Sequence, residues 1–255
     1  MCNCWSPRIV RRNCERTNHI TFVGDRNTCL HVHFNAVTGS NERPNSRRCG
    51  WREDQRVAWT YYVEGSWGAA PTVMGNMLYI GDNNGVVHAI NAVSGKCCWK
   101  LGVAPANTRS RKLFSRAAVS DRRVYLGAAD GTLYALDRAS GARMWQHDCG
   151  DWIRSQPHCA GGVVCAATLD GKVIAVTDEG NACQALWSAE LGRHPIYADL
   201  AGDHEGVIAT TSDFQTVALD LRTGKRQWIR SLIRCTQTDG VRAFADSMPA
   251  LPNRR

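Results

Sequence analysis

An eleven-residue pattern recurs through this chain, and its spacing limits what the chain can fold into. Each gapless copy begins with Ala, carries Gly at its seventh position and ends in Trp at its eleventh. Three gapless copies and one looser copy with two extra residues span residues 89–99, 135–145, 218–228 and 175–187. The tryptophans at positions 59, 99, 145, 187 and 228 lie 40 to 46 residues apart. Self-similarity at that period is typical of propeller blades or solenoid units, so we expect a repeat fold.

Each copy is preceded by a segment that predicts a β-hairpin. Two apolar runs, Met77–Gly81 and Val86–Ile90, flank a short polar stretch that ends in Asn84-Gly85. Asp130-Gly131 and Asp170-Gly171 occupy the same place in the next two copies. An Asn-Gly or Asp-Gly pair supplies the positive φ that a two-residue hairpin turn needs. A second turn follows at the Gly of the pattern, and a further strand lies upstream, so each unit is expected to hold four short strands.

The repeat resembles the quinoprotein, or pyrroloquinoline-quinone-like, β-propeller repeat with its tryptophan-docking motif. The resemblance covers residues 60 to 230 and implies an all-β fold in which four-stranded antiparallel blades stack around an axis. It also implies that the motif residues are structural docking residues. These are Trp59, Trp99, Trp145, Trp187 and Trp228, with Gly95, Gly141 and Gly224.

The repeat divides the chain into three regions. Residues 1–58 form a degenerate first blade with an Arg-rich insertion at about 40–55, which we expect to be an exposed loop. Residues 59–231 hold four regular blades, at about 69–102, 115–148, 155–190 and 197–231. Residues 232–255 are a tail or the start of a further blade, in which Val241–Asp246 could begin a strand.

About five blades are therefore visible in the sequence. Closed propellers of this repeat family usually have more blades than that. An open arc would leave the faces of its first and last blades uncovered. Small residues on the expected inner strands, at 68–70 and 117–118, would permit close approach near the axis. We expect a closed or nearly closed monomer, and the alternative is a partial propeller completed by another chain.

Charge and cysteine content narrow the class of protein. The net charge is +8, and residues 1–58 contain ten Arg against five acidic residues. We interpret this bias as a solvated face rather than a nucleic-acid signal, although Arg also suits phosphate or carboxylate contacts. The twelve cysteines, in a chain of 255 residues with no visible export signal, favour reduced and mostly buried thiols. As written, the chain predicts a cytoplasmic protein without a membrane span, or a periplasmic one if its true N-terminus is missing.

The cysteines and histidines offer few candidate metal sites. Cys2 and Cys4, like His31 and His33, place two ligands on one side of an extended chain, but neither pair has a second pair at zinc-site spacing. The polar residues of the hairpin turns, such as Asp82, Asn84 and Asp130, are explained by turn chemistry. We therefore predict no metal site.

The resemblance also raises a catalytic alternative. Quinoprotein dehydrogenases place a vicinal disulfide against their cofactor, and Cys97-Cys98 is such a pair in sequence. Here the pair lies on an expected outer strand, away from the axis, so we interpret it as packing. No residue can be aligned with the Glu, Asn and Asp that hold calcium in that family, and no haem-attachment motif is present. No catalytic residue is assigned.

Two functions remain open from the sequence. The first is a non-catalytic scaffold that binds a protein or ligand partner through its loop faces, with no cofactor. The second is a fragment or sensor domain of a quinone-dependent alcohol dehydrogenase-like protein, with pyrroloquinoline quinone and calcium as cofactors. The lack of alignable cofactor ligands favours the scaffold over an enzyme, and the identity of the partner stays open.

Overall fold

The structure is a computed structural model. It describes residues 69–103, 110 and 112–231 with their side chains, together with residues 59, 61 and 63. It also describes the backbone of residue 62 and of the strands at 9–10, 18–23 and 29–34. The Arg-rich segment at 40–55, the pair Cys2 and Cys4, and the tail from 232 lie outside the described residues.

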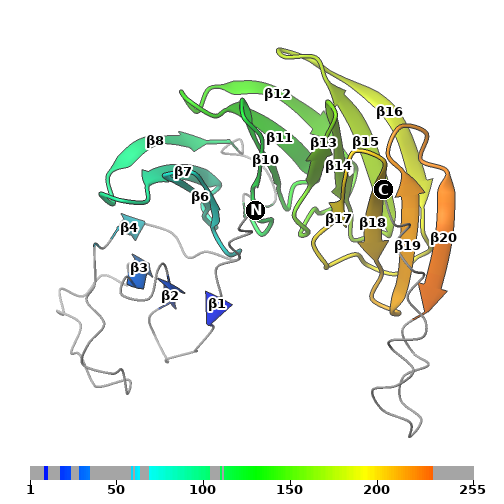
Figure 1. The fold of residues 1–255 in the computed structure, drawn as a ribbon, viewed down its shortest axis with the longest axis horizontal. Coiled ribbons are helices and arrows are strands. Elements are labelled where there is room, and N and C mark those ends of the chain that lie inside the picture. The colour runs from blue at the N-terminus through cyan, green and yellow to red at the C-terminus, as the bar shows by residue number, and fades with distance from the viewer. Residues whose placement is uncertain are drawn as a thin grey trace, which may run out of the picture.

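The prediction of an all-β fold built from four-stranded sheets is confirmed. The chain forms five such sheets, and Figure 1 shows them following one another around an arc in chain order. The first sheet holds β1 (Ile9–Val10), β2 (Asn18–Val23), β3 (Cys29–Phe34) and β4 (Tyr62–Val63). The second holds β5 (Thr72–Met74), β6 (Met77–Gly81), β7 (Val86–Asn91) and β8 (Cys97–Gly102). The third holds β9 (Ala118–Val119), β10 (Arg123–Gly127), β11 (Thr132–Asp137) and β12 (Arg143–Asp148). The fourth holds β13 (His158–Ala160), β14 (Val163–Ala167), β15 (Lys172–Asp178) and β16 (Cys183–Glu190). The fifth holds β17 (Ala201–Gly202), β18 (Gly206–Thr210), β19 (Gln215–Asp220) and β20 (Arg226–Ser231).

Within each sheet the strands are ordered from the inside of the arc to its outer rim. The first strands β5, β9 and β13 contact one another from sheet to sheet, and the last strands lie on the rim (Figure 1). The described sheets form an open arc, with β1–β4 at one end and β17–β20 at the other. The expected closed or nearly closed ring is therefore not formed by the described residues.

The first sheet also departs from the expected antiparallel pattern. β4 pairs with β3 in parallel, through His33 opposite Tyr62 and Phe34 opposite Val63. Parallel neighbours need a long connection, because the chain has to return to the end at which it started. Residues 35–61, which include the Arg-rich segment, supply that length.

The hairpins between second and third strands differ in type from the expected two-residue turns. In the second sheet the Gly85 N–H donates to the carbonyl of Asp82 at 3.2 Å, and Gly85 has φ 81°. The preceding Asn84 does not have positive φ. This is a tight turn followed by one left-handed residue, the usual form of a slightly longer hairpin loop. Only the Gly of each Asn-Gly or Asp-Gly pair is therefore required by the backbone.

The Ala and Trp of the repeated pattern are directly opposed across two strands. Ala89 pairs with Trp99, Ala135 with Trp145, Ala175 with Trp187 and Ala218 with Trp228. In all four sheets the register shifts by one residue immediately after the Ala. Such a bulge increases the local twist of the outer strand.

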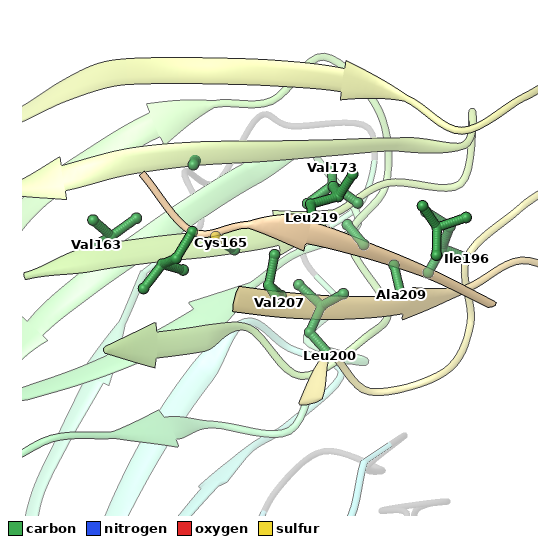
Figure 2. Close-up of a cluster of buried hydrophobic side chains, with 12 residues drawn as sticks. Val163, Cys165, Val173, Ile196, Leu200, Val207, Ala209 and Leu219 are labelled. Atoms are coloured by element: carbon green, nitrogen blue, oxygen red, sulfur yellow. The ribbon is translucent and has the colours of Figure 1, made fainter. Parts of the chain in front are cut away.

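The core is divided into layers, each lying between two consecutive sheets. Figure 2 shows the layer between the fourth and fifth sheets, where Val163, Cys165 and Val173 face Val207, Ala209 and Leu219. A similar layer joins the second and third sheets, and another joins the third and fourth. Fully burying a Val or Leu side chain stabilises a protein by about 1.5–3 kcal/mol, so each sheet depends on its neighbours for most of its apolar burial.

Candidate functional site

Three of the repeated tryptophans make the same contact with the sheet that follows them. The indole N–H of Trp59 donates to the carbonyl of Ala92 at 2.9 Å, and that of Trp99 to Arg138 at 3.0 Å. Trp187 donates to Leu221 at 2.9 Å. Each acceptor belongs to the last turn of the next sheet, between its third and fourth strands. These contacts link consecutive sheets at the end where the turn between the third and fourth strands lies.

The glycines of the pattern are required by these rings. Gly95, Gly141 and Gly224 have φ of 70°, 76° and 67°, which side chains rarely adopt. A Cβ atom at each position would lie 2.5 Å from the nearest ring atom of the docked indole. The pattern thus places a residue with no side chain where a tryptophan of the preceding sheet approaches the backbone.

Trp145 is bound differently because the looser copy carries two extra residues. Its indole N–H donates to the Asp178 carboxylate at 2.9 Å instead of to a backbone carbonyl. The Tyr125 hydroxyl donates to the same carboxylate at 2.6 Å, and the Arg123 guanidinium lies 3.8 Å from it. Burial, followed by this hydrogen bond, raises the pKa of Tyr125 well above its usual value. A cavity of about 380 Å³ adjoins these residues. Their polar atoms already interact with one another and so link the third and fourth sheets.

Trp228 does not have the docked environment expected from the sequence. It is 38% exposed, whereas Trp145 is 6% exposed. Its indole N–H has no acceptor among the residues that the structure describes. Among the described residues, no sheet follows the fifth one to cover the ring.

The opposite end of the sheets carries the chain segments that join one sheet to the next. We call this end the linker face; it comprises residues 112–117, 149–157 and 191–200 with the hairpins at 82–85, 128–131, 168–171 and 211–214. First and second strands are antiparallel, so the linker entering a sheet and the hairpin leaving its second strand lie at the same end. The linkers are bonded to these hairpins, as in the 2.9 Å bond from the Ser212 N–H to the carbonyl of Pro195.

Aromatic and cationic side chains from three successive linkers meet on this face. The Arg154 guanidinium carbon lies 4.8 Å from the ring centre of Phe114 and 5.7 Å from that of Tyr197. Phe114 also stacks on Trp152, with ring centres 6.4 Å apart and planes 27° apart. Trp152 is 42% exposed and Tyr197 is 53% exposed. We call these four residues the aromatic–arginine cluster.

A small cavity lies beside the cluster. It has a volume of about 350 Å³ and is lined by seven residues, Ala69, Ala70, Phe114, Arg116, Arg154, Tyr197 and Asp199. Arg116 forms a 3.2 Å ion pair with Asp199, and the other oxygen of Asp199 accepts the Gln156 N–H at 2.8 Å. Asp199 is therefore held in place, whereas the exposed Arg154 guanidinium contacts the rings of Phe114 and Tyr197. The cavity thus offers a guanidinium flanked by rings.

Phe214 adds a further exposed ring to the linker face. It is 59% exposed and has φ 65° in the hairpin of the fifth sheet. The equivalent positions in the second, third and fourth sheets are Gly85, Gly131 and Gly171. Left-handed backbone costs a non-glycine residue about 1–2 kcal/mol, so a phenylalanine here is held at the expense of stability. The turn pattern of the sequence did not single out this residue, although the missing Gly after Asp213 is a signal for it.

The described cysteines belong to no group of side chains that could hold a metal ion. Cys97 and Cys98 are both exposed on β8, so the packing role expected for them is wrong; a rim strand has no neighbour beyond it to cover these positions. Cys149 and Cys165 are buried, and burial raises the pKa of each thiol to about 12. All six described cysteines are free thiols.

The calcium and quinone of the dehydrogenase alternative find no matching ligand set in the described residues. No group of three or more His, Cys, Asp or Glu side chains is placed there to hold a metal ion. Asp82, one of the turn residues, uses one carboxylate oxygen to accept the N–H groups of Asn84 and Val86 and the other to contact His88 at 3.2 Å. The side chains of His31 and His33 lie outside the described residues.

No described segment forms a helix with the length and hydropathy of a membrane span.

Comparison with known proteins places this fold in a family. Residues 83–250 match the family model described as outer membrane protein assembly factor BamB. BamB of Yersinia pestis is 28% identical over 182 residues, which cover 63% of this chain and 43% of the relative. The serine/threonine-protein kinase AfsK of Streptomyces coelicolor is 29% identical over 188 residues, covering 72% of this chain and 21% of the kinase. A shorter stretch of 105 residues is 33% identical to quinohemoprotein alcohol dehydrogenase of Comamonas testosteroni, covering 38% of this chain and 14% of the enzyme.

A solved structure shows the same fold. BamB of Moraxella catarrhalis superposes with a TM-score of 0.57 at 20% identity, over 84% of this chain and 60% of that one. The chain spans less than half the length of the curated relatives named above. The resemblance to the pyrroloquinoline-quinone-like repeat is confirmed, and the chain belongs to the BamB family of β-propeller repeat proteins.

Proposed function

We propose that this chain is a non-catalytic propeller scaffold that binds a protein partner through its linker face. The observation that carries the proposal is the aromatic–arginine cluster, in which the exposed Arg154 guanidinium lies between the partly exposed ring of Phe114 and the exposed ring of Tyr197. Trp, Tyr and Arg are the residues most enriched at the energetic centres of protein interfaces. Exposed apolar groups that gather on one face are also typical of interaction sites.

The preorganisation of the cluster supports the same role. Linker residues that anchor this face are fully buried, among them Leu113 next to Phe114 and Ile153 between Trp152 and Arg154. The rings are therefore presented from segments with fixed backbones, which reduces the entropy lost on binding. The name of the BamB relatives, outer membrane protein assembly factor, favours a role in assembly with other proteins.

The proposal can be tested with peptides selected from a displayed random-peptide library on the full chain. The affinity of the tightest selected peptide should be at least about 30-fold lower for the Trp152→Ser/Tyr197→Ser variant. This fall corresponds to the loss of about 2 kcal/mol of binding free energy that truncation at the energetic centre of an interface causes. Val93→Ser is the matched control, because Val93 is 71% exposed in a turn at the other end of the sheets. Peptides that bind the double variant unchanged but fail on Val93→Ser would overturn the proposal.

The quinone-dependent dehydrogenase is the alternative function. It is supported by a distant sequence relation over a short stretch. It predicts dye reduction with alcohols after addition of quinone and calcium, and loss of that activity with a chelator. Such turnover would replace the scaffold as the favoured function.

A further inference from the structure

A buried histidine–carboxylate pair lies between the first and second sheets. His88 of β7 is 5% exposed, and Asp82, directly after β6, is 2% exposed. The His88 Nε2 atom lies 3.2 Å from one carboxylate oxygen of Asp82. The other oxygen accepts the N–H groups of Asn84 and Val86, so the hairpin turn fixes the carboxylate. The carboxylate in turn fixes the tautomer of the imidazole, with hydrogen on Nε2 and a lone pair on Nδ1.

The Tyr61 hydroxyl continues this chain of polar groups towards the surface. It lies 3.2 Å from the Nδ1 atom of His88, and the two rings meet edge to face with centres 5.8 Å apart. Because Nδ1 carries a lone pair in this tautomer, the hydroxyl donates to it. Tyr61 packs on Leu78, Ile80 and Ile90, and burial raises its pKa well above the usual value. The hydroxyl therefore keeps its proton at neutral pH.

The thiol of Cys97 interacts with the same hydroxyl at the rim of the second sheet. Cys97 of β8 is exposed, and its thiol forms a side-chain hydrogen bond with Tyr61. The sulfur also lies 3.4 Å from the carbonyl of Trp99. Thiol, hydroxyl, imidazole and carboxylate thus follow one another from the surface to the interior. A nucleophile linked to a base that a third group orients is the arrangement by which proteins activate Ser and Cys.

The neighbouring thiol of Cys98 has different surroundings. Its sulfur lies 3.9 Å from that of Met77, which packs in the core layer between the second and third sheets. Tyr61 packs on the other face of the second sheet, towards the first. The side chains of Cys97 and Cys98 therefore point to opposite faces, as those of neighbouring strand residues do. Two exposed thiols on one strand thus differ in their access to Tyr61.

The repeat itself does not require these side chains. Tyr61 lies two residues after a repeated Trp, His88 directly precedes a repeated Ala, and Cys97 is the ninth residue of its copy. The same positions at the joint between the second and third sheets hold Leu101, Tyr134 and Arg143. Two consecutive sheets can therefore pack together without a histidine or a thiol at these positions. The set at the first joint is thus better explained by the chemistry of its thiol than by packing.

We propose that Cys97 is a site of reversible thiolation, at which its thiol exchanges with a small-molecule disulfide. The Cys97 sulfur attacks one sulfur of the disulfide, whose S–S bond breaks while a new S–S bond to Cys97 forms. Cys97 is oxidised, and the released half of the disulfide is reduced to a thiolate. The site is independent of the proposed protein-binding role.

The polar chain supplies the route for the proton, because the thiolate and not the thiol is the nucleophile. The thiol proton passes to the Tyr61 oxygen while the Tyr61 proton passes to Nδ1 of His88. The Asp82 carboxylate stabilises the imidazolium that forms, since an opposite charge nearby favours the charged form. The proton then returns through Tyr61 to the released thiolate, which leaves as a thiol. Tyr61 carries the proton, His88 accepts it and Asp82 is a positioning residue.

The first test compares the two neighbouring thiols in the full chain. Bis(2-hydroxyethyl) disulfide is the probe because it is uncharged, and mass spectrometry follows its addition to residues 97–100. Cys98→Ser reports on Cys97, and Cys97→Ser reports on Cys98. A positioned proton acceptor typically accelerates a step by about 10²–10⁴-fold, so Cys97 should react at least about tenfold faster than Cys98. Equal rates would overturn the proposal.

The second test is Tyr61→Phe, which removes the hydroxyl and keeps the ring that packs between the sheets. The rate at Cys97 should fall at least about tenfold, because the thiol loses its route to His88. The rate at Cys98 is the control for a general change in structure, and it should stay the same. An unchanged rate at Cys97, or equal changes at both thiols, would contradict the proposed route.

The third test uses the reduced, unsubstituted chain and so does not depend on the folding of a variant. Nitrogen-15 NMR of the histidine rings should show His88 with its hydrogen on Nε2 and a lone pair on Nδ1. A hydrogen on Nδ1 would overturn the proposal, because that atom could not then accept the proton from Tyr61.

Discussion

The fourth and fifth sheets have the same repeated pattern but different surroundings. Trp187 of the fourth sheet docks on Gly224 of the fifth and donates to the Leu221 carbonyl, while Trp228 of the fifth sheet is 38% exposed. Both tryptophans lie opposite an Ala in the same bulged register. The neighbouring sheet, rather than the tryptophan's own sheet, therefore provides the burial and the hydrogen-bond acceptor.

The largest expected difference is between Trp145→Ala and Trp228→Ala. Trp145 is almost fully buried and holds Asp178, so its removal should cost about 3–5 kcal/mol of unfolding free energy. Trp228 has no following sheet among the described residues, and its removal should cost about 1 kcal/mol or less. Urea unfolding of both variants checks this, and equal losses would show that the two sheets are covered alike.

A smaller difference is expected between Gly141→Ala and Gly180→Ala. Both glycines have positive φ, 76° and 87°, so both substitutions carry the same backbone cost of about 1–2 kcal/mol. Only Gly141 has a docked ring, that of Trp99, at 2.5 Å from an added Cβ, which should add about 1–3 kcal/mol. The space around Gly180 is open. Thermal unfolding that ranks the two variants equally would mean that the ring does not hold its docked position.

Phe214→Gly should raise stability. It removes the cost of a left-handed phenylalanine, partly offset by the greater freedom of glycine in the unfolded chain, and the net gain should be about 0.5–1 kcal/mol by thermal unfolding. The same variant should weaken the binding of any partner that contacts the exposed ring on the linker face. Gly131→Phe, which makes the reverse change in the third sheet, should destabilise; a stabilising effect there would contradict the strain argument.

The smallest effect concerns pH. The hydrogen bond from the Ser140 hydroxyl, followed by that from the Ser140 N–H, lowers the pKa of Asp137 below its usual value. A lowered pKa in the folded state stabilises the protein above the unfolded pKa, and this contribution is lost as the pH falls through the folded value.

Asp137→Asn should therefore reduce the loss of stability on acidification below about pH 4. Asn91 already accepts the same turn hydrogen bonds in the second sheet, so the turn itself should persist in the variant. Thermal midpoints measured across this pH range provide the check, and an identical pH dependence in both proteins would exclude Asp137 as a contributor.

Much of the fold could be predicted because the relevant signals are local in sequence. The Ala, Gly and Trp of each gapless copy lie within eleven residues, and the period of the copies predicts a repeat fold. The predicted type of hairpin turn is wrong, because Asn84-Gly85 is compatible with two loop lengths and only the backbone bonds distinguish them. The acceptor of Trp145 could not be predicted either, since the two extra residues replace a carbonyl by the Asp178 side chain.

The candidate site was less accessible from the sequence than the fold. Phe114, Arg154 and Tyr197 lie about 40 residues apart, and each has an ordinary local context. They meet only because consecutive linkers lie side by side at one end of the sheets. Their common position becomes visible in the sequence once the linkers are aligned on their buried anchors, Leu113, Ile153 and Ile196.

The most direct test of the proposed role is photo-cross-linking of the full chain in its own cells. A photoreactive amino acid would replace Tyr197 on the linker face or, as the control, Val93 at the other end of the sheets. The proposal predicts that one defined protein is cross-linked from position 197 and is absent from position 93, and that Trp152→Ser abolishes the product. The same set of products from both positions, or a product that survives Trp152→Ser unchanged, would contradict it.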